Sequence, residues 1–153
     1  MTVAYIESLA PAMQLAENSN RDLGRPEVLR AAGAWLARLC READCSVVVA
    51  ASRSAEWIVA SAVLSDGELV PASADARSRR VMIVEGAVVT GSALHHAARL
   101  ARSEGATWVG AAVLQRTRPD LDQIESVGFD LIRDLWDGHA SLMAQSAAAA
   151  AST

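Results

Sequence analysis

The residues best suited to chemistry lie together near the middle of the chain: Thr90, Gly91, Ser92 and Ala93. They come where a helix is expected to begin, and the first N–H groups of a helix lack intrahelical partners and carry partial positive charge. Such a helix start binds anions, phosphate in particular. Glu85, at the end of the preceding apolar run, could accept hydrogen bonds from sugar hydroxyls. The structural alternative is a capped turn, with Ser92 as N-cap and Gly91 as turn residue.

A second polar loop, Ser52–Ser54, follows another apolar run. The Arg53 guanidinium can bind a phosphate through two parallel hydrogen bonds, or it could form an ion pair with an acid such as Glu56. The Ser52 and Ser54 hydroxyls could donate to the same anion or cap the helix that follows. The loop is therefore a candidate second anion site, with a structural role as its alternative.

Apolar runs and helical periodicity predict the elements that carry these loops. Continuous β-branched runs are typical of strands buried on both faces, and apolar residues spaced three and four apart indicate helices. The expected strands are 45–51, 68–72, 81–84, 107–114 and 129–135. The expected helices are 26–43, 55–64, about 92 to a C-terminal cap at Gly105, and 120–127.

This order of elements predicts an α/β fold with an open, mostly parallel twisted sheet flanked by helices. Ligands of such sheets bind at the carboxyl ends of the strands, where both polar loops lie. The length of 153 residues fits a single domain, expected over residues 1–140. Residues 141–153 form an Ala-rich C-terminal tail.

Composition narrows the classes of function. The formal net charge of -4 argues against general binding to nucleic acid or to an anionic membrane. All fourteen basic residues are Arg, so chemistry that needs a lysine amine is excluded. No apolar run reaches the roughly 20 residues of a membrane span. No signal peptide is visible either, so a cytoplasmic protein is expected.

Few other residues suggest a site. Cys40 and Cys45 are expected to be two buried thiols, since no further metal ligands accompany them. His95 and His96 are adjacent on a helix and lie about 100° apart around it, so exposed positions are favoured over a shared metal. Trp57 is expected in the core or at a dimer interface.

Residues 84–94, V-E-G-A-V-V-T-G-S-A-L, resemble a motif of type I phosphoribosyltransferases, and of orotate phosphoribosyltransferase in particular. In that family a strand, two acidic residues and V-x-T-T-G-G-S precede a helix. The later segments E-G-A-T-W-V-G-A-A-V-L-Q-R and S-V-G-F-D-L-I-R-D-L are similar to the family's closing elements. The earlier segment V-V-V-A-A-S-R-S-A-E-W-I-V-A-S-A-V-L resembles its strand, pyrophosphate loop and helix. The resemblance covers about residues 27–136.

The resemblance implies a role for each candidate residue. Thr90–Ala93 would hold a 5′-phosphate, Ser52–Ser54 a pyrophosphate, and Glu85 the ribose hydroxyls as the one candidate catalytic residue. The chain departs from the family pattern at Gly86, which replaces the second acid, at Val89, which replaces the first threonine, and at Ser92, which replaces a glycine. Active members use phosphoribosyl pyrophosphate (PRPP) together with Mg²⁺, and the family commonly forms homodimers.

The family's mobile loop and base-binding hood are expected to be reduced. Only residues 66–80 are available for the loop, and they contain no Lys. Arg77, Arg79 and Arg80 could replace part of its charge, or Arg79 and Arg80 could be solvated residues at a strand start.

These observations lead to three expectations of function. The favoured one is a degenerate phosphoribosyltransferase-like protein, non-catalytic or regulatory, that binds PRPP or a nucleotide. The alternative is an active phosphoribosyltransferase of orotate or purine type, which makes a nucleoside monophosphate from PRPP and a base. The third is a structural or interaction domain. The expected partners are a small phosphorylated sugar or nucleotide and, from the family, a second copy of the chain.

Overall fold

The computed structural model describes residues 21–71, 79–88, 90–116 and 128–135. The predictions for the helix at 120–127, for Val89, for the Ala-rich tail and for residues 72–78 of the mobile loop, Arg77 among them, fall outside these residues.

Five strands form one sheet in the order β2-β1-β3-β4-β5, and every pair of neighbours is parallel. The strands are β1 (Val47–Ala50), β2 (Val70–Pro71), β3 (Arg80–Val88), β4 (Trp108–Arg116) and β5 (Leu131–Asp134). The central strands are rich in Val, Ile and Ala and are almost wholly buried, as strands covered on both faces must be. The prediction of an open parallel α/β sheet is confirmed.

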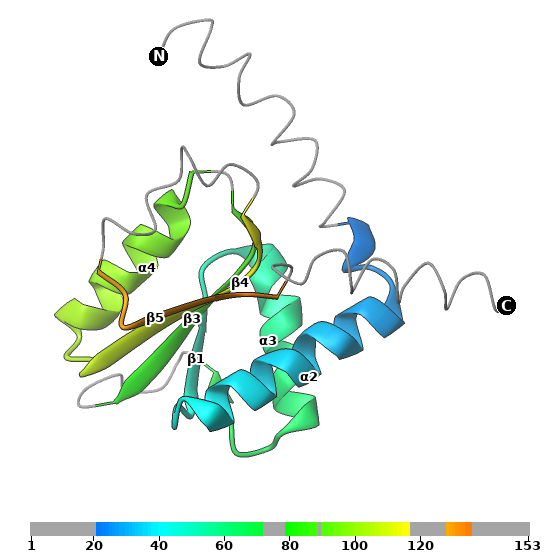
Figure 1. Cartoon of the computed structure of the whole chain (residues 1–153), viewed down its shortest axis with the longest axis horizontal. Coiled ribbons are helices and arrows are strands. Elements are labelled where there is room, and N and C mark those ends of the chain that lie inside the picture. Colours follow the sequence, from blue (N-terminus) through cyan, green and yellow to red (C-terminus); the bar gives the residue numbers. More distant parts are fainter. Residues whose placement is uncertain (1–20, 72–78, 89, 117–127, 136–153) are drawn as a thin grey trace, which may run out of the picture.

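Three helices cover the two faces of the sheet (Figure 1). α2 (Pro26–Glu42) and α3 (Arg53–Ser65) pack together on one face. α4 (Ser92–Ser103) covers the other. Each face has its own apolar cluster, with Met82 and Val84 on the α2–α3 side and Ile83 and Val113 on the α4 side. Successive side chains of β3 point to opposite faces of the sheet, so this one strand contributes to both apolar clusters.

The contact between α2 and α3 depends on Gly33, in the middle of α2. A Cβ atom built at this position would lie 2.1 Å from Ser61 Oγ and 2.6 Å from Ser61 Cβ. Ser61 Oγ also donates to Leu29 O at 2.9 Å, which joins the two helices at the same place. Only a glycine allows this approach, and it sets the position of α3 against the sheet.

Two element boundaries bear on the site. Gly105 follows α4 in the left-handed region with φ 96°, which confirms the predicted cap. β3, by contrast, continues to Val88, whereas the sequence predicted a loop from Glu85 onward. The strand continues because Ala87 and Val88 still pair with Gln115 and Arg116 of β4. Glu85 consequently lies inside a strand rather than at its end.

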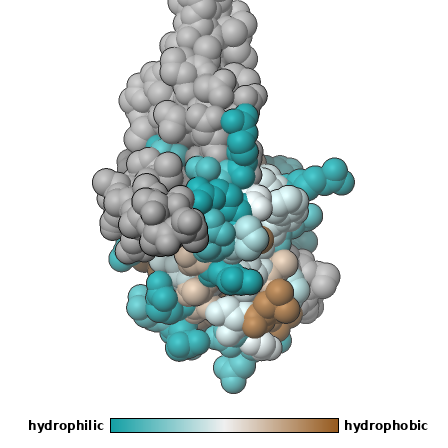
Figure 2. All heavy atoms as spheres, turned by 90° about the vertical axis from the view of Figure 1, so that its right-hand side faces the viewer, coloured by the Kyte–Doolittle hydropathy of each residue, from teal (hydrophilic) through white to brown (hydrophobic). Residues whose placement is uncertain are grey.

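The outer surface of the α2–α3 side is mainly polar, with a small apolar patch (Figure 2). Trp57 is 54% exposed on α3, so it is not part of this chain's core, which was one of the two places predicted for it. Within the described residues, no helix has the length and hydropathy needed to cross a membrane.

Candidate functional site

The two polar loops meet because the chain adds its next strand on opposite sides of the neighbouring strands β1 and β3. From β1 the chain moves outward to β2, whereas from β3 it moves the other way to β4. In open parallel sheets the crevice at such a switch point is where ligands bind. The loop after β1 stays beside β3, and Ala51 N donates to Val84 O at 2.8 Å. Ser52 and Glu85, 33 residues apart, thereby come into contact.

α4 begins directly beyond this crevice. Gly91 is its N-cap, in the left-handed region with φ 81°, and Ser92 is its first helical residue. The sequence offered Ser92 as a structural N-cap, but the cap lies one residue earlier because the chain needs a left-handed turn there, and glycine adopts it without strain. Gly91 has no side chain to cap the helix, and the one side-chain contact to its first N–H is long, from Ser92 N to Thr90 Oγ1 at 3.5 Å. Its first N–H groups therefore lack intrahelical acceptors and are suited to an anion.

A hollow of about 210 Å³ lies at this helix start. Its lining includes all four residues predicted for the phosphate seat, Thr90, Gly91, Ser92 and Ala93, together with Glu85. Thr90 Oγ1 lies 3.3 Å from Ser92 Oγ, so the two hydroxyls are adjacent. Ser92 and Ala93 are exposed, so a ligand in the hollow can reach their N–H groups.

Glu85 is the single charged residue among the buried residues of the described chain, and it is only 7% exposed. Its Oε1 accepts from Ser52 Oγ at 2.5 Å and from the backbone N–H of Gly86 at 2.8 Å. Burial raises the pKa of this carboxyl above its usual value, and the two hydrogen bonds oppose the rise without cancelling it. Glu85 thus borders the hollow but bonds inward, to the loop after β1.

The three residues of the Ser52–Ser54 loop do not all face the same site. Ser52 Oγ bonds Glu85, receives a long hydrogen bond of 3.4 Å from Ala55 N as the N-cap of α3, and lies 3.1 Å from Ser54 Oγ. Arg53 and Ser54 line a different hollow of about 300 Å³, beside Trp57. Among the described residues Arg53 forms no ion pair with Glu56.

The residues present do not form a good site for a protein-bound magnesium ion. A divalent cation of this kind is held by several oxygen ligands, usually with one or two carboxylates. Glu85 uses Oε1 within the protein, and Gly86 has no side chain to replace the second acid. Over the described ranges, no group of three or more His, Cys, Asp or Glu side chains could hold a metal.

Sequence reasoning missed an ion pair near the same edge of the sheet. Arg116 Nε, at the end of β4, lies 2.7 Å from Asp134 Oδ2 on β5, and the Asp134 side chain is 8% exposed. Val113 pairs with Glu85 on one side and with Asp134 on the other, which places the two carboxyl groups in one row across the sheet. The sequence shows an Arg and an Asp near the ends of two strands, but only the strand register brings them together.

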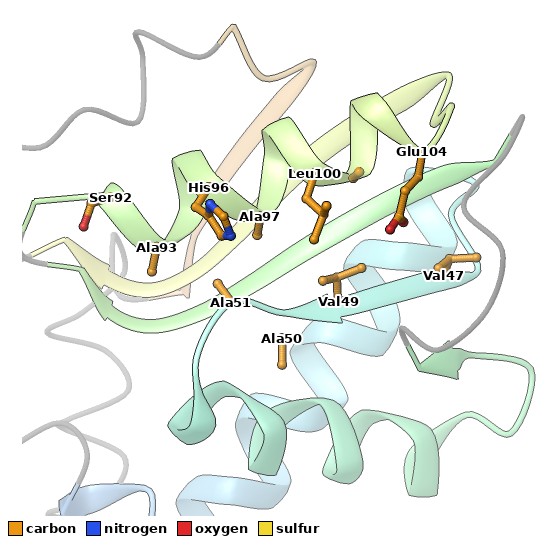
Figure 3. A pocket seen from close by; sticks show the side chains of 11 residues that line it. Val47, Val49, Ala50, Ala51, Ser92, Ala93, His96, Ala97, Leu100 and Glu104 are labelled. Carbon is orange, nitrogen blue, oxygen red and sulfur yellow. The ribbon is translucent and has the colours of Figure 1, made fainter.

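A larger hollow, of about 500 Å³, lies between α4 and β1 (Figure 3). Val49 of β1 and Ala51, in the loop after β1, face Ala97 and Leu100 of α4 across it, and Glu104 lies at its far end. Most of these side chains are apolar, and of the four residues predicted for the phosphate seat only Ser92 and Ala93 line this hollow. The candidate anion site is the smaller hollow at the start of α4.

Comparison with known proteins identifies the fold. No protein-family model matches the sequence, and no curated protein matches it significantly. Among solved structures, the chain is similar to a purine phosphoribosyltransferase from Pyrococcus horikoshii Ot3, with a TM-score of 0.52 and 19% identity over 72% of this chain and 83% of that one. It is similar to a hypoxanthine-guanine-xanthine phosphoribosyltransferase, with a TM-score of 0.51 and 15% identity over 76% of each chain. It also resembles a phosphoribosylpyrophosphate synthetase from Mycobacterium smegmatis, with a TM-score of 0.51 and 18% identity over 74% of this chain and 50% of that one.

These similarities establish that the chain has the type I phosphoribosyltransferase fold, as predicted. The closer resemblance to orotate enzymes stays a prediction, because the similar structures named here are purine transferases and a synthetase.

Proposed function

We propose that this chain binds a ribose-5-phosphate-type ligand, PRPP or a nucleotide, through the Thr90–Ala93 loop, and that it does so without catalysing phosphoribosyl transfer. The observation that carries the proposal is the start of α4: a helix N-terminus whose N-cap residue, Gly91, has no side chain, and which opens into a hollow at the switch point of the sheet. The three similar structures are all named for phosphoribosyl chemistry, which favours a phosphorylated pentose over other anions.

The seat itself would be made mainly by the backbone. N–H groups at the beginning of α4 point along the helix axis, and the Thr90 and Ser92 hydroxyls add donors beside them. Because backbone donors do not depend on side-chain identity, the seat tolerates the departure from the family motif at Ser92. Gly91 remains the residue that lets the chain turn closely around a phosphate.

The non-catalytic part of the proposal rests on Glu85. Phosphoribosyl transfer, as the family implies, develops positive charge on the sugar while magnesium pyrophosphate leaves, so it needs well-placed negative groups. Glu85 is buried, bonded to Ser52 and Gly86, and its raised pKa reflects a disfavoured charge. The Ser52 hydroxyl donates to Glu85 and accepts from Ala55 N as the cap of α3, so it is poorly placed to hold pyrophosphate.

The binding part is tested by calorimetric titration of the full chain with inorganic phosphate, ribose 5-phosphate and PRPP, with and without Mg²⁺. Ser92→Glu places a carboxylate at the proposed seat. An acidic residue in the first turn favours the helix itself, so the variant should fold. We expect it to weaken binding at least tenfold, or about 1.4 kcal/mol.

Ser103→Glu is the matched control, because it adds the same charge at an exposed position near the other end of α4. It should bind like the wild type. Equal loss in both variants, or no binding of any of the three compounds by the wild type, would contradict the proposed seat.

The non-catalytic part is tested separately by measuring pyrophosphate release from PRPP with Mg²⁺ and either orotate or a purine base. We expect no release above the rate without protein. Release that the wild type supports and Ser92→Glu abolishes would identify an active transferase instead, and would leave the phosphate seat in place.

A further inference from the structure

Cys40 and Cys45 lie at the opposite edge of the sheet from the phosphate loop, where α2 ends and the chain turns into β1. The backbone closes the helix with two hydrogen bonds: Cys45 N donates to Cys40 O at 2.8 Å, and Asp44 N donates to Arg41 O at 3.2 Å. Asp44 adopts the left-handed conformation, with φ 53°. This is a Schellman motif, which brings together the side chains three positions before the helix cap and two positions after it. In this chain those two side chains are thiols.

The backbone spacing already suits a disulfide. Bond lengths on either side of the 2.8 Å hydrogen bond limit the Cα–Cα separation of Cys40 and Cys45 to about 7 Å at most. Disulfides span Cα–Cα distances of roughly 4.4 to 6.8 Å. The Cys45 thiol lies within hydrogen-bond distance of two backbone carbonyl oxygens, Arg80 O at 3.2 Å and Val47 O at 3.4 Å.

The two cysteines are chemically unequal. Cys40 is fully buried, whereas Cys45 is 5% exposed, so Cys45 is the thiol that a small molecule reaches first. The neighbouring Cys45 thiol and burial both raise the pKa of Cys40, and the neighbouring Cys40 thiol and the Arg80 guanidinium lower the pKa of Cys45 against the effect of burial. Accessibility and pKa thus both favour Cys45 as the attacking thiol, and the thiolate is the reactive form.

A small oxidant has a way to approach the pair. Both cysteines line a hollow of about 240 Å³, together with Asp44, Asp66 and other residues of the turns at this edge of the sheet. Cys45 is only 5% exposed, so a molecule as small as hydrogen peroxide suits this opening better than a bulky disulfide reagent does.

We propose that Cys40 and Cys45 are a redox-active pair that hydrogen peroxide converts into an intramolecular disulfide. The Cys45 thiolate attacks one peroxide oxygen, the O–O bond breaks, hydroxide leaves, and Cys45 becomes a sulfenic acid. The Cys40 sulfur then attacks Cys45 sulfur, the S–O bond breaks, and water leaves with the Cys40 proton. Two thiols and one peroxide thus give one disulfide and two water molecules, with sulfur oxidised and peroxide oxygen reduced.

The test treats the reduced, full-length protein with hydrogen peroxide and measures its intact mass. We expect the mass to fall by two hydrogen atoms and both thiols to become unavailable for alkylation after unfolding. Dithiothreitol should reverse both changes. Trypsin cuts after Arg38, Arg41 and Arg53, so a disulfide should join peptide 39–41 to peptide 42–53.

Two variants separate the roles of the cysteines. Cys40→Ala should stop at the sulfenic acid, with a mass gain of one oxygen atom that dimedone captures. Cys45→Ala should show no peroxide-dependent change at matched dose. Reversed behaviour of the two variants would contradict the assignment of Cys45 as the attacking thiol.

The wild-type protein alone can overturn the proposal, even if neither variant folds. Two thiols that remain open to alkylation after peroxide treatment would overturn the proposal, as would a disulfide found only between two chains. Circular dichroism on the same samples should show the native spectrum throughout. A disulfide that forms only after this spectrum is lost would overturn the proposal too, because the folded pair would not be the reacting species.

Discussion

Removing the Ser52 hydroxyl should destabilise the fold in a way that depends on the charge of Glu85. Ser52→Ala deletes a hydrogen bond of 2.5 Å to a buried carboxyl group and a long cap contact of 3.4 Å to Ala55 N. A hydrogen bond to a charged group contributes about 1.5–3 kcal/mol. A cap contributes roughly 0.5 kcal/mol at the weak end of its range. We expect the free energy of unfolding to fall by about 2–3 kcal/mol at pH 7.

The loss of unfolding free energy caused by Ser52→Ala should be smaller at acidic pH. Burial raises the folded-state pKa of Glu85 above 4.5, so folding favours its protonated form, and this contribution to stability is lost as pH rises through the folded pKa. Ser52 opposes that rise, so Ser52→Ala moves the folded pKa further upward. The deficit is therefore largest at pH 7. Near pH 4.5 a neutral hydrogen bond remains to be lost, which contributes about 1 kcal/mol.

A double-mutant cycle provides the control. Glu85→Gln keeps the size and the acceptor but removes the charge, so Ser52→Ala should cost about 1 kcal/mol less in this background at pH 7. The measurement is urea unfolding of the four proteins at both pH values, followed by tryptophan fluorescence. An equal cost of Ser52→Ala in both backgrounds and at both pH values would refute the reasoning, since the loss would then come from the α3 cap alone.

Three further predictions concern the scaffold. Gly33→Ala should lower the free energy of unfolding by about 1–3 kcal/mol, because its Cβ would overlap Ser61, and Gly33→Ala combined with Ser61→Gly should recover part of the loss. Arg80→Met should destabilise by roughly 1–3 kcal/mol and change Trp108 fluorescence, since Arg80 lies 4.3 Å from the Trp108 ring centroid and donates to Ala43 O. An unchanged urea midpoint in either variant would contradict these contacts. Gly91→Ala should cost about 1–2 kcal/mol, because φ is 81° there, and Gly91→Asn should cost less.

Much of the fold could be predicted from the sequence, because buried parallel strands are continuous apolar runs. β1 and β4 were located in this way, whereas the order of the strands in the sheet was not predicted. Strand ends were less predictable. β3 passes through Glu85 because β4 still offers it hydrogen-bonding partners, and pairing between distant strands leaves no local signal.

The failures have physical causes too. The helix that contains Trp57 is apolar nearly all around, so periodicity could not tell which face the sheet would bury. The structure buries Ala55, Ile58 and Ala62, a stripe that leaves Trp57 outside. The burial of Cys40 and Cys45 was predicted and is confirmed. Their proximity was not predicted, because it depends on a left-handed turn at Asp44. A left-handed turn is usually signalled by a glycine, and the sequence has none there.

The position of Glu85 links the two parts of the proposed function, phosphate binding and the absence of catalysis. Its carboxyl joins β3 to the loop after β1, through Ser52, and so fixes the two loops against each other at the switch point. A group engaged in this way, with its charge disfavoured by burial, is poorly suited to hold a metal ion or stabilise a cationic sugar. The proposed phosphate seat depends on backbone N–H groups held by the same pair of loops. The Ser52–Glu85 hydrogen bond therefore also helps to hold the proposed seat in shape, which is why we propose that binding persists without catalysis.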